Sequence, residues 1–240
     1  FDKGQWQGQG EWHGSNGEVY RGQFNQGLFE GQGALTTNAS SYSGGFKAGR
    51  RNGEGTLKEN GMSYRGEFKA DQYAGLGRLE LEDGSSYQGQ FAHGKPNGEG
   101  QRGDGNGNQF TGHFVDGQLE GNGTFNSADG DIYVGSFKNN QLHGKGRYEN
   151  ADGDVWLGEF KEGSLNGKGE LIGTDGSHYI GQFNDWRFSG QGRLNLADGS
   201  FYTGQFDNDS YQGRGTLVLT DGTVLSGTWI NGQRVRDSEG

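Results

Sequence analysis

The chain has 240 residues, of which 52 are glycine and one is proline, and ordinary apolar residues make up only 28%. So much glycine with so little hydrophobicity usually indicates disorder, but here the glycines are periodic, and they do not recur at every third position as collagen requires. A formal charge of −10 argues against nucleic-acid binding and against a general attraction to anionic membranes. Without cysteine there is no disulfide framework, thiolate metal site or thiol nucleophile.

One short pattern recurs along the whole chain: an aromatic residue, a glycine and a second aromatic residue at alternate positions, as in Tyr133-Gly135-Phe137. The ten copies begin at Tyr20, Tyr42, Tyr64, Tyr87, Phe110, Tyr133, Trp156, Tyr179, Tyr202 and, in a degenerate copy, Leu225. The first two steps are 22 residues long and every later step is 23. A fixed period over this many copies indicates a repeat array, in which each unit packs mainly on its neighbours.

A second pattern precedes each aromatic copy: Gly-x-Gly and then an apolar residue two positions later, as in Gly121-Gly123-Phe125. Positions two apart lie on one face of a strand, so both patterns predict β-strands with glycines and large side chains on a shared face. The copy at Gly98-Gly100-Arg102 departs from the pattern, with a charge at the apolar position. An aromatic ring is expected to lie over a glycine of the neighbouring strand, where no side chain obstructs it.

Asn-Gly or Asp-Gly separates the two strands of most units, which predicts a two-residue type I′ turn and therefore a β-hairpin. These pairs are Asn16-Gly17, Asn60-Gly61, Asp83-Gly84, Asn106-Gly107, Asp129-Gly130, Asp152-Gly153, Asp175-Gly176, Asp198-Gly199 and Asp221-Gly222. Asn38-Ala39 is a weak copy. A connecting loop leads to the next hairpin, and its usual glycine is missing at Asp71, Asn140, Trp186 and Asp209.

Large side chains recur just after each connecting loop: Trp6, Phe29, Tyr73, Phe188 and Tyr211, with Leu119, Leu142 and Leu165 in other units. We expect them to close the edge of the core. The alternative is that some line a groove for an extended peptide.

The order Gly-x-Gly, apolar residue, Asp-Gly, Tyr-x-Gly-x-Phe resembles the MORN (membrane occupation and recognition nexus) repeat family over nearly the whole chain. The resemblance implies an all-β fold: an elongated, twisted single-layer array of about ten consecutive β-hairpins without catalysis of its own. It also implies that such arrays serve as protein-binding scaffolds, as dimerisation modules or as phosphoinositide-binding modules, often fused to enzymes.

The array is expected to occupy residues 1–232, with a C-terminal tail at 233–240 and a terminal cap beginning near Trp229. Phe1 stands 19 residues before Tyr20, as Phe114 stands before Tyr133. The chain is therefore expected to begin inside a repeat and to be a piece or a processed form of something longer.

Motifs that could carry chemistry find little support. Gly98-Glu-Gly100-Gln-Arg-Gly103 matches a dinucleotide fingerprint by letter, but no βαβ unit surrounds it. Asp104-Gly-Asn106-Gly-Asn108 resembles half a calcium loop, but lacks the glycine and the glutamate that such a loop needs. The five histidines show no metal-ligand spacing and are expected on the surface. No catalytic, cofactor or metal residue is predicted, and the chain is not expected to be an enzyme.

Two candidate surfaces remain. On the face opposite the aromatic one, repeats six to nine carry apolar residues at Ile132, Val134, Val155, Leu157, Ile180 and Phe201. An apolar row of this kind would suit a partner or dimer surface, unless it reflects only β-propensity, with Lys145, Arg147, Lys168 and Arg193 covering it with their stems. A basic run at Lys47, Arg50, Arg51, Lys58, Arg65 and Lys69 would suit an acidic partner or lipid headgroups. The alternative interpretation of this basic run is a solvated face whose positive charge is neutralised by Glu54, Glu59 and Glu67.

The leading hypothesis is a non-catalytic scaffold that binds another protein or a second copy of itself. The alternatives are a membrane- or phosphoinositide-targeting module, and an accessory array of a larger enzyme whose catalytic domain is absent here.

Overall fold

The computed structural model describes residues 2–235, and across them it contains 21 β-strands and no helix. The chain divides into unit 1 (Phe1–Leu119) and unit 2 (Glu120–Gly240), with the boundary inside β11. The first ten strands are β1 (Gly8–His13), β2 (Val19–Asn25), β3 (Leu28–Thr36), β4 (Ser40–Lys47), β5 (Arg50–Glu59), β6 (Met62–Lys69), β7 (Gln72–Glu80), β8 (Ser86–Ala92), β9 (Lys95–Gly103) and β10 (Gln109–Val115). The rest are β11 (Gln118–Asn126), β12 (Ile132–Lys138), β13 (Gln141–Glu149), β14 (Val155–Lys161), β15 (Ser164–Ile172), β16 (His178–Asn184), β17 (Arg187–Asn195), β18 (Phe201–Asp207), β19 (Ser210–Val218), β20 (Val224–Ile230) and β21 (Gln233–Arg234).

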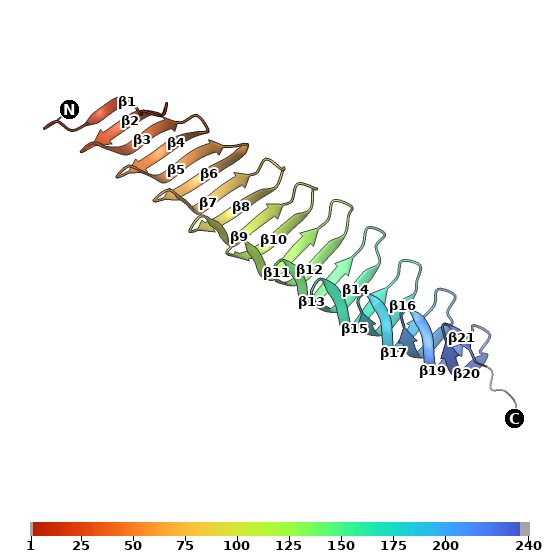
Figure 1. The fold of residues 1–240 in the computed structure, drawn as a ribbon. Helices are drawn as coiled ribbons and strands as arrows, with labels where there is room; N and C mark the ends of the chain where they lie inside the picture. The colour runs from red at the N-terminus through yellow and green to blue at the C-terminus, as the bar shows by residue number, and fades with distance from the viewer. Residues whose placement is uncertain (1, 236–240) are drawn as a thin grey trace. The chain divides into compact units, whose positions relative to one another are not determined.

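Within each unit, strands that follow one another in the chain pair side by side and antiparallel (Figure 1). Gly135 of β12, for example, lies opposite Gly123 of β11 and Gly146 of β13, so the glycines form a row across the strands. The predicted all-β array of consecutive hairpins is therefore confirmed. The strand count of 21 exceeds what ten hairpins supply, because β21 adds a short strand beside β20.

Each strand presents its tyrosine, glycine and phenylalanine positions on one side, here called the core face, and the alternating side chains on the outer face. Tyr133 is fully buried, and its ring lies over Gly135 and Gly146, where an added Cβ would overlap it. Its hydroxyl donates a hydrogen bond to the Ser136 carbonyl oxygen at 3.0 Å. The predicted packing of rings over glycines is confirmed.

The large side chains that follow the connecting loops occupy what we call the stacking position, opposite the phenylalanine of the preceding strand. Phe29 stacks face to face on Tyr20 with ring centroids 3.7 Å apart. The pairs Tyr64–Tyr73, Tyr179–Phe188 and Tyr202–Tyr211 repeat this geometry at 3.8 Å. Leu119 and Leu165 are fully buried at the same position. These residues close the core, as predicted.

The predicted two-residue Asp-Gly turn is wrong in most repeats. Eight of these turns have three residues, and only the glycine has a positive φ, as in Glu82-Asp83-Gly84, which Leu81 and Ser85 close through a backbone hydrogen bond. The reason is local: the Asp83 carboxylate accepts a hydrogen bond from the Ser85 backbone N–H at 2.9 Å, which holds the aspartate out of the left-handed region. Asn60-Gly61 alone has the positive φ at both residues that a type I′ turn requires.

The tight two-residue turns lie instead in the connecting loops, where both residues have positive φ, as in Gln26-Gly27. At the four positions without glycine the geometry is kept, with φ of 71° at Asp71, 66° at Asn140, 69° at Trp186 and 68° at Asp209. A left-handed conformation costs a residue with a Cβ about 1–2 kcal/mol, and aspartate and asparagine tolerate it best. Trp186 is therefore the unusual case.

Contacts of the Trp186 ring explain why this strained position is kept. The ring centroid lies 4.9 Å from that of Tyr148 and 5.5 Å from that of Phe160, in edge-to-face geometry. The tight turn thus sends an aromatic side chain back over the preceding repeat, where it also meets Trp156 at 6.1 Å.

Replacing Trp186 should destabilise unit 2 despite relieving strain. We expect Trp186→Ala to cost about 3 kcal/mol through the lost ring contacts, and Trp186→Gly about 1 kcal/mol less because glycine removes the left-handed strain. Chemical denaturation, followed by a circular dichroism signal to which tryptophan does not contribute, measures the unfolding free energy of both variants. A Trp186→Gly variant more stable than the wild type would show that the ring contacts do not hold this turn.

Alkaline pH should weaken the core. Burial raises the pKa of Tyr42, Tyr87, Tyr133 and Tyr179 to about 12. Because the folded state favours the neutral phenol, its stability is complete below the unfolded pKa of about 10 and is lost as the pH rises from there through about 12. Urea midpoints should therefore fall over this window, and a midpoint that stays constant across it would contradict this prediction.

The C-terminal end of the array is a short addition to the last hairpin. Trp229 is buried and lies opposite Arg234 of β21. Of the expected tail at 233–240, residues 233 and 234 form β21, and residues 236–240, like Phe1, lie outside the described part.

Candidate functional site

The outer face carries two rows of side chains that run across the strands and flank the tyrosine positions. We call the row of residues that follow the tyrosines the central row, and the row of residues that precede them the turn-side row. The strand register places both rows residue by residue, so it decides which predicted site residues are neighbours.

In unit 2 the central row alternates apolar and charged residues from Val134 to Arg193 and carries hydroxyl side chains at its other positions. It contains Thr124, Val134, Arg147, Leu157, Glu170, Ile180, Arg193, Thr203, Thr216 and Ser226. Val134 and Ile180 are 50% and 54% exposed. The structure thus places the predicted Val134, Leu157 and Ile180 in one row, two strands apart, with a charge between each pair.

The turn-side row of unit 2 is more apolar than the sequence analysis anticipated. It contains Asn126, Ile132, Glu149, Val155, Ile172, His178, Asn195, Phe201, Val218 and Val224. Three of these were missed: Ile172, Val218 and Val224, of which Ile172 and Val224 are 44% and 59% exposed. Extending the outer-face pattern to the Gly-x-Gly strands would have found Ile172 and Val218, and extending it to the tenth aromatic copy would have found Val224.

Unit 1 shows the opposite character on its outer face. Its central row contains Glu11, Arg21, Ala34, Ser43, Thr56, Arg65, Arg78, Gln88, Gln101 and Thr111. Its turn-side row contains His13, Val19, Thr36, Ser41, Lys58, Ser63, Glu80, Ser86, Gly103 and Gln109. Only Val19 and Ala34 are apolar in these two rows, and Leu76, opposite Gln90 in the row on the other side of the glycines, is a further exposed apolar residue. The apolar residues of the central and turn-side rows therefore concentrate in unit 2.

Charged side chains cover part of the apolar rows. The Arg193 guanidinium lies 4.0 Å from the ring centroid of Phe201, and its Nε donates a hydrogen bond to Asn195. Arg147 forms an ion pair with Glu149 on its own strand, and the His178 ring lies within hydrogen-bond distance of the Glu170 carboxylate. Arg193 therefore covers Phe201 with its side chain, as the alternative interpretation of the apolar row supposed. That these apolar residues bind a partner stays a prediction.

The predicted basic run does not form one patch. Lys47 lies opposite Arg50 beside the tight turn, Lys69 lies opposite Gln72, and Arg65 lies opposite Arg78 in the central row. Lys58 lies in the turn-side row, toward the other end of the strands. Lys47, Arg50 and Lys69 thus lie beside tight turns, whereas Arg65 and Lys58 lie farther along the strands.

Arg51 is not a free surface cation. It occupies a stacking position, with its guanidinium carbon 5.4 Å from the ring centroid of Phe68 and 5.8 Å from that of Tyr42. Its Nε also forms an ion pair with Asp71 at 3.2 Å, and the side chain is only 27% exposed. Its partner is therefore Asp71 rather than Glu54, Glu59 or Glu67.

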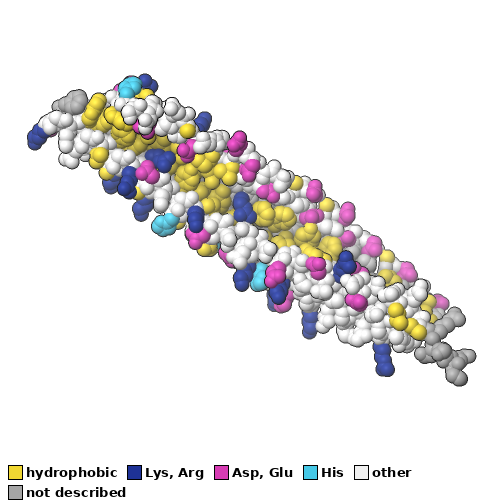
Figure 2. All heavy atoms as spheres, viewed as in Figure 1, with side chains coloured by type: hydrophobic (Ala, Val, Ile, Leu, Met, Phe, Trp, Pro, Cys, Tyr) yellow, Lys and Arg dark blue, Asp and Glu magenta, His cyan; other side chains and the backbone are white. Residues whose placement is uncertain are grey.

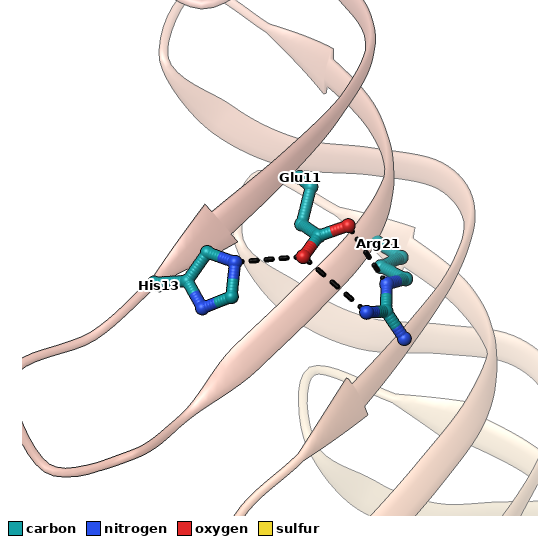
Figure 3. Close-up of polar contacts among 3 residues, drawn as sticks. All are labelled: Glu11, His13 and Arg21. Carbon is teal, nitrogen blue, oxygen red and sulfur yellow. Dashed lines mark hydrogen bonds and ion pairs between the residues drawn. The ribbon is translucent and has the colours of Figure 1, made fainter.

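Three of the five histidines, His13, His113 and His178, lie beside glutamates. At the start of unit 1 the Glu11 carboxylate sits between the His13 ring and the Arg21 guanidinium, at 2.7 Å and 2.9 Å (Figure 3). The hydrogen bond from Arg21 lowers the pKa of Glu11, and His13 adds to the effect. His113 contacts Glu99 at 3.0 Å. Within residues 2–235, no three His, Cys, Asp or Glu side chains form a group suited to a metal ion.

The partial calcium-loop match at Asp104 has a structural role. Its carboxylate accepts hydrogen bonds from the backbone N–H groups of Asn106 and Asn108, each at 3.0 Å. These bonds, with the Asn108 side chain at 2.7 Å, lower the pKa of Asp104 and organise the turn.

A surface view separates the side-chain types. Figure 2 shows hydrophobic side chains gathered along the middle of the face in view, and Lys and Arg side chains along one of its margins. No helix among residues 2–235 is long and apolar enough to cross a membrane.

Hairpins repeated at a step of 22 or 23 residues, with one face closed by aromatic rings and the other left open, define a β-hairpin repeat protein. The MORN repeat family model matches residues 20–37, 42–62, 64–86, 87–109, 110–132, 133–155, 156–178 and 202–224. The protein belongs to the MORN repeat family.

Known proteins add only distant likenesses. No curated protein matches the sequence. The SAS-4 (dCPAP) TCP domain of Drosophila melanogaster, solved with a proline-rich motif of Ana2, is 14% identical with a TM-score of 0.39 over 65% of this chain and 85% of that one. The TCP10 domain of Danio rerio CPAP is 12% identical with a TM-score of 0.33 over 92% of this chain and 100% of that one. At these scores the likeness supports no argument about function.

Proposed function

We propose that this MORN repeat chain is a non-catalytic scaffold that binds another protein through the outer face of unit 2. The observation that carries the proposal is the exposure of aliphatic side chains there: Val134, Ile172, Ile180 and Val224 are each 44% exposed or more. A single-layer sheet has no need of hydrophobic residues on its second face, and a gathered apolar surface favours an interaction site. The polar outer face of unit 1 serves as an internal comparison.

Self-association and binding of anionic phospholipid are the alternative proposals, and an accessory role beside a catalytic domain is a third. Self-association would use the same face and would appear in sedimentation equilibrium. Lipid binding would use Lys47, Arg50 and Lys69, and would appear as salt-sensitive sedimentation with phosphoinositide vesicles.

Replacing the three aliphatic residues of the central row tests the leading proposal. The variant V134S/L157S/I180S should lose at least about tenfold in binding, because the changes remove apolar surface, exposed at Val134 and Ile180 and half-buried at Leu157, that a partner would cover. Its thermal midpoint should stay close to that of the wild type, since the changes lie outside the core. Affinity capture from the native source with quantitative mass spectrometry compares the bound proteins.

The matched control is S43A/Q88S/T111S, which changes the same register positions in unit 1. It should retain the proteins that the wild type captures. If the unit 2 variant captures the same proteins in the same amounts, the outer face of unit 2 is not the binding surface.

A further inference from the structure

The outer face of unit 2 is cationic, although the chain as a whole carries −10. The central row, the turn-side row and the row on the other side of the glycines hold five cations: Lys145, Arg147, Lys168, Arg193 and Arg214. They hold three anions, Glu149, Glu159 and Glu170. The acidic residues of unit 2 concentrate instead in its turns, as at Asp152 and Asp175.

The aliphatic residues of this face recur at a spacing that the repeat sets. Val134, Leu157 and Ile180 stand on β12, β14 and β16, so each is two strands from the next. At about 4.8 Å per strand this gives steps of about 9.6 Å across the sheet. One heptad of an α-helix advances about 10.5 Å, so a helix tilted by about 25° from the row would match the step.

Aliphatic side chains occupy both the central row and the turn-side row, so the apolar surface is wide enough for one side of a helix. Ile132 and Val155 lie two residues before Val134 and Leu157 on the same strands, about 7 Å away. Beside Leu157, on its other side, the surface is hollowed over Gly146 and Gly158 and lined by Lys145, Glu159 and Lys168. The face therefore offers an aliphatic band with basic side chains along its flank.

We propose that the outer face of unit 2 binds an acidic amphipathic α-helix that lies across the strands and meets one MORN repeat with each heptad. The proposal rests on the proposed scaffold function and specifies the partner of the same surface. Leucine-like residues of the helix would cover Val134, Leu157 and Ile180, and its flanking glutamates or aspartates would face Lys145 and Lys168.

Other occupants fit less well. A second copy of unit 2 would oppose one cationic face to another, which is repulsive. Alternate side chains of an extended strand recur at about 6.8 Å, which does not match the repeat. A polyproline II segment has a matching turn of about 9.3 Å but prefers aromatic grooves, and the one aromatic residue in these rows, Phe201, is covered by Arg193.

The test uses the whole chain and labelled synthetic peptides of three heptads. The acidic peptide has leucine at the first and fourth positions of each heptad, glutamate at the fifth and seventh, and alanine elsewhere. A second peptide has lysine in place of every glutamate, and a third keeps the glutamates but has a proline in each heptad. Fluorescence anisotropy reports binding, circular dichroism reports helix formation, and sedimentation with phosphatidylserine vesicles tests the membrane.

The acidic peptide should bind at least tenfold more tightly than the other two and should gain helicity on binding. Its affinity should fall with rising salt, and at least tenfold in the exposed charge variant K145E/K168E, but not in R65E/R78E, which reverses two outer-face cations in the central row of unit 1. Equal or tighter binding of the lysine or the proline peptide, or vesicle binding that K145E/K168E abolishes, would overturn the proposal.

Failure of this proposal is distinguishable from failure of the scaffold function. If V134S/L157S/I180S loses captured proteins while the acidic peptide does not bind, the scaffold function stands and the helical partner is wrong. If that variant captures the same proteins as the wild type, the scaffold function itself falls.

Discussion

Gly100→Ala should destabilise unit 1 strongly, whereas Gly103→Ala, in the same strand β9, should have little effect. A Cβ at Gly100 would overlap the Tyr87 ring, whereas a Cβ at Gly103 would meet no atom closer than the Ser86 hydroxyl oxygen at 3.2 Å. Tyr87 is 3% exposed, and its ring packs edge to face against Phe91 and Phe114, each at 5.0 Å between centroids. Forcing extra volume into such packing costs about 2–3 kcal/mol.

Neither glycine of this pair has a positive φ, so the comparison isolates the overlap with the ring from backbone strain. Urea denaturation of the two variants, followed by circular dichroism, gives the difference in unfolding free energy. Equal midpoints for the two variants would mean that the ring over the glycine is not a tight contact. The adjacent stacking residue, Pro96, is unchanged in both variants.

Tyr133→Ala should be the most damaging single change in unit 2. The ring is fully buried and makes edge-to-face contacts with Phe137 at 5.2 Å and Phe160 at 5.0 Å between centroids. Removing a buried aromatic ring costs about 3–5 kcal/mol, because the lost contacts and the cavity add together. Phe160 belongs to the next repeat, so the change also weakens the contact between repeats.

Tyr133→Phe separates the ring from its hydroxyl group. The hydroxyl donates to the Ser136 carbonyl oxygen at 3.0 Å and lies 3.4 Å from that of His143, and losing it should cost about 1 kcal/mol. Phe110 already holds this position in another repeat, so the ring alone is compatible with the fold. Thermal and urea unfolding of both variants measure the costs. A phenylalanine variant as unstable as the alanine one would assign the stabilisation to the hydroxyl instead.

The repeat period predicted most of the fold because it reports side-chain alternation directly. The alternation of Tyr133, Gly135 and Phe137 fixes which side chains share a face, and the glycines fix the register between strands. The turns were less predictable, because Asp-Gly is compatible with turns of two or three residues. The Asp83 side chain selects the longer turn through a hydrogen bond to Ser85 that composition does not reveal.

The residues of the candidate surfaces were likewise only partly predictable from the sequence. Val134, Leu157 and Ile180 were predictable because each stands beside a tyrosine whose orientation the repeat defines. Ile172 and Val224 were missed because the pattern was read on too few strands. Arg51 was misread as a surface cation, since its position in the repeat is a stacking position and only the structure shows its guanidinium on Tyr42 and Phe68.

Pairing of each strand with its neighbours in the chain has a consequence for how the protein folds. Contacts such as Gly22 with Gly33 join residues 33 − 22 = 11 positions apart, so the sheet forms without closing long loops. All-β proteins usually fold slowly because their pairings are distant in sequence, whereas a meander of local hairpins has a low contact order. Each hairpin can therefore form and pair with its neighbour without waiting for distant parts of the chain, and folding can begin at any hairpin and spread to the next.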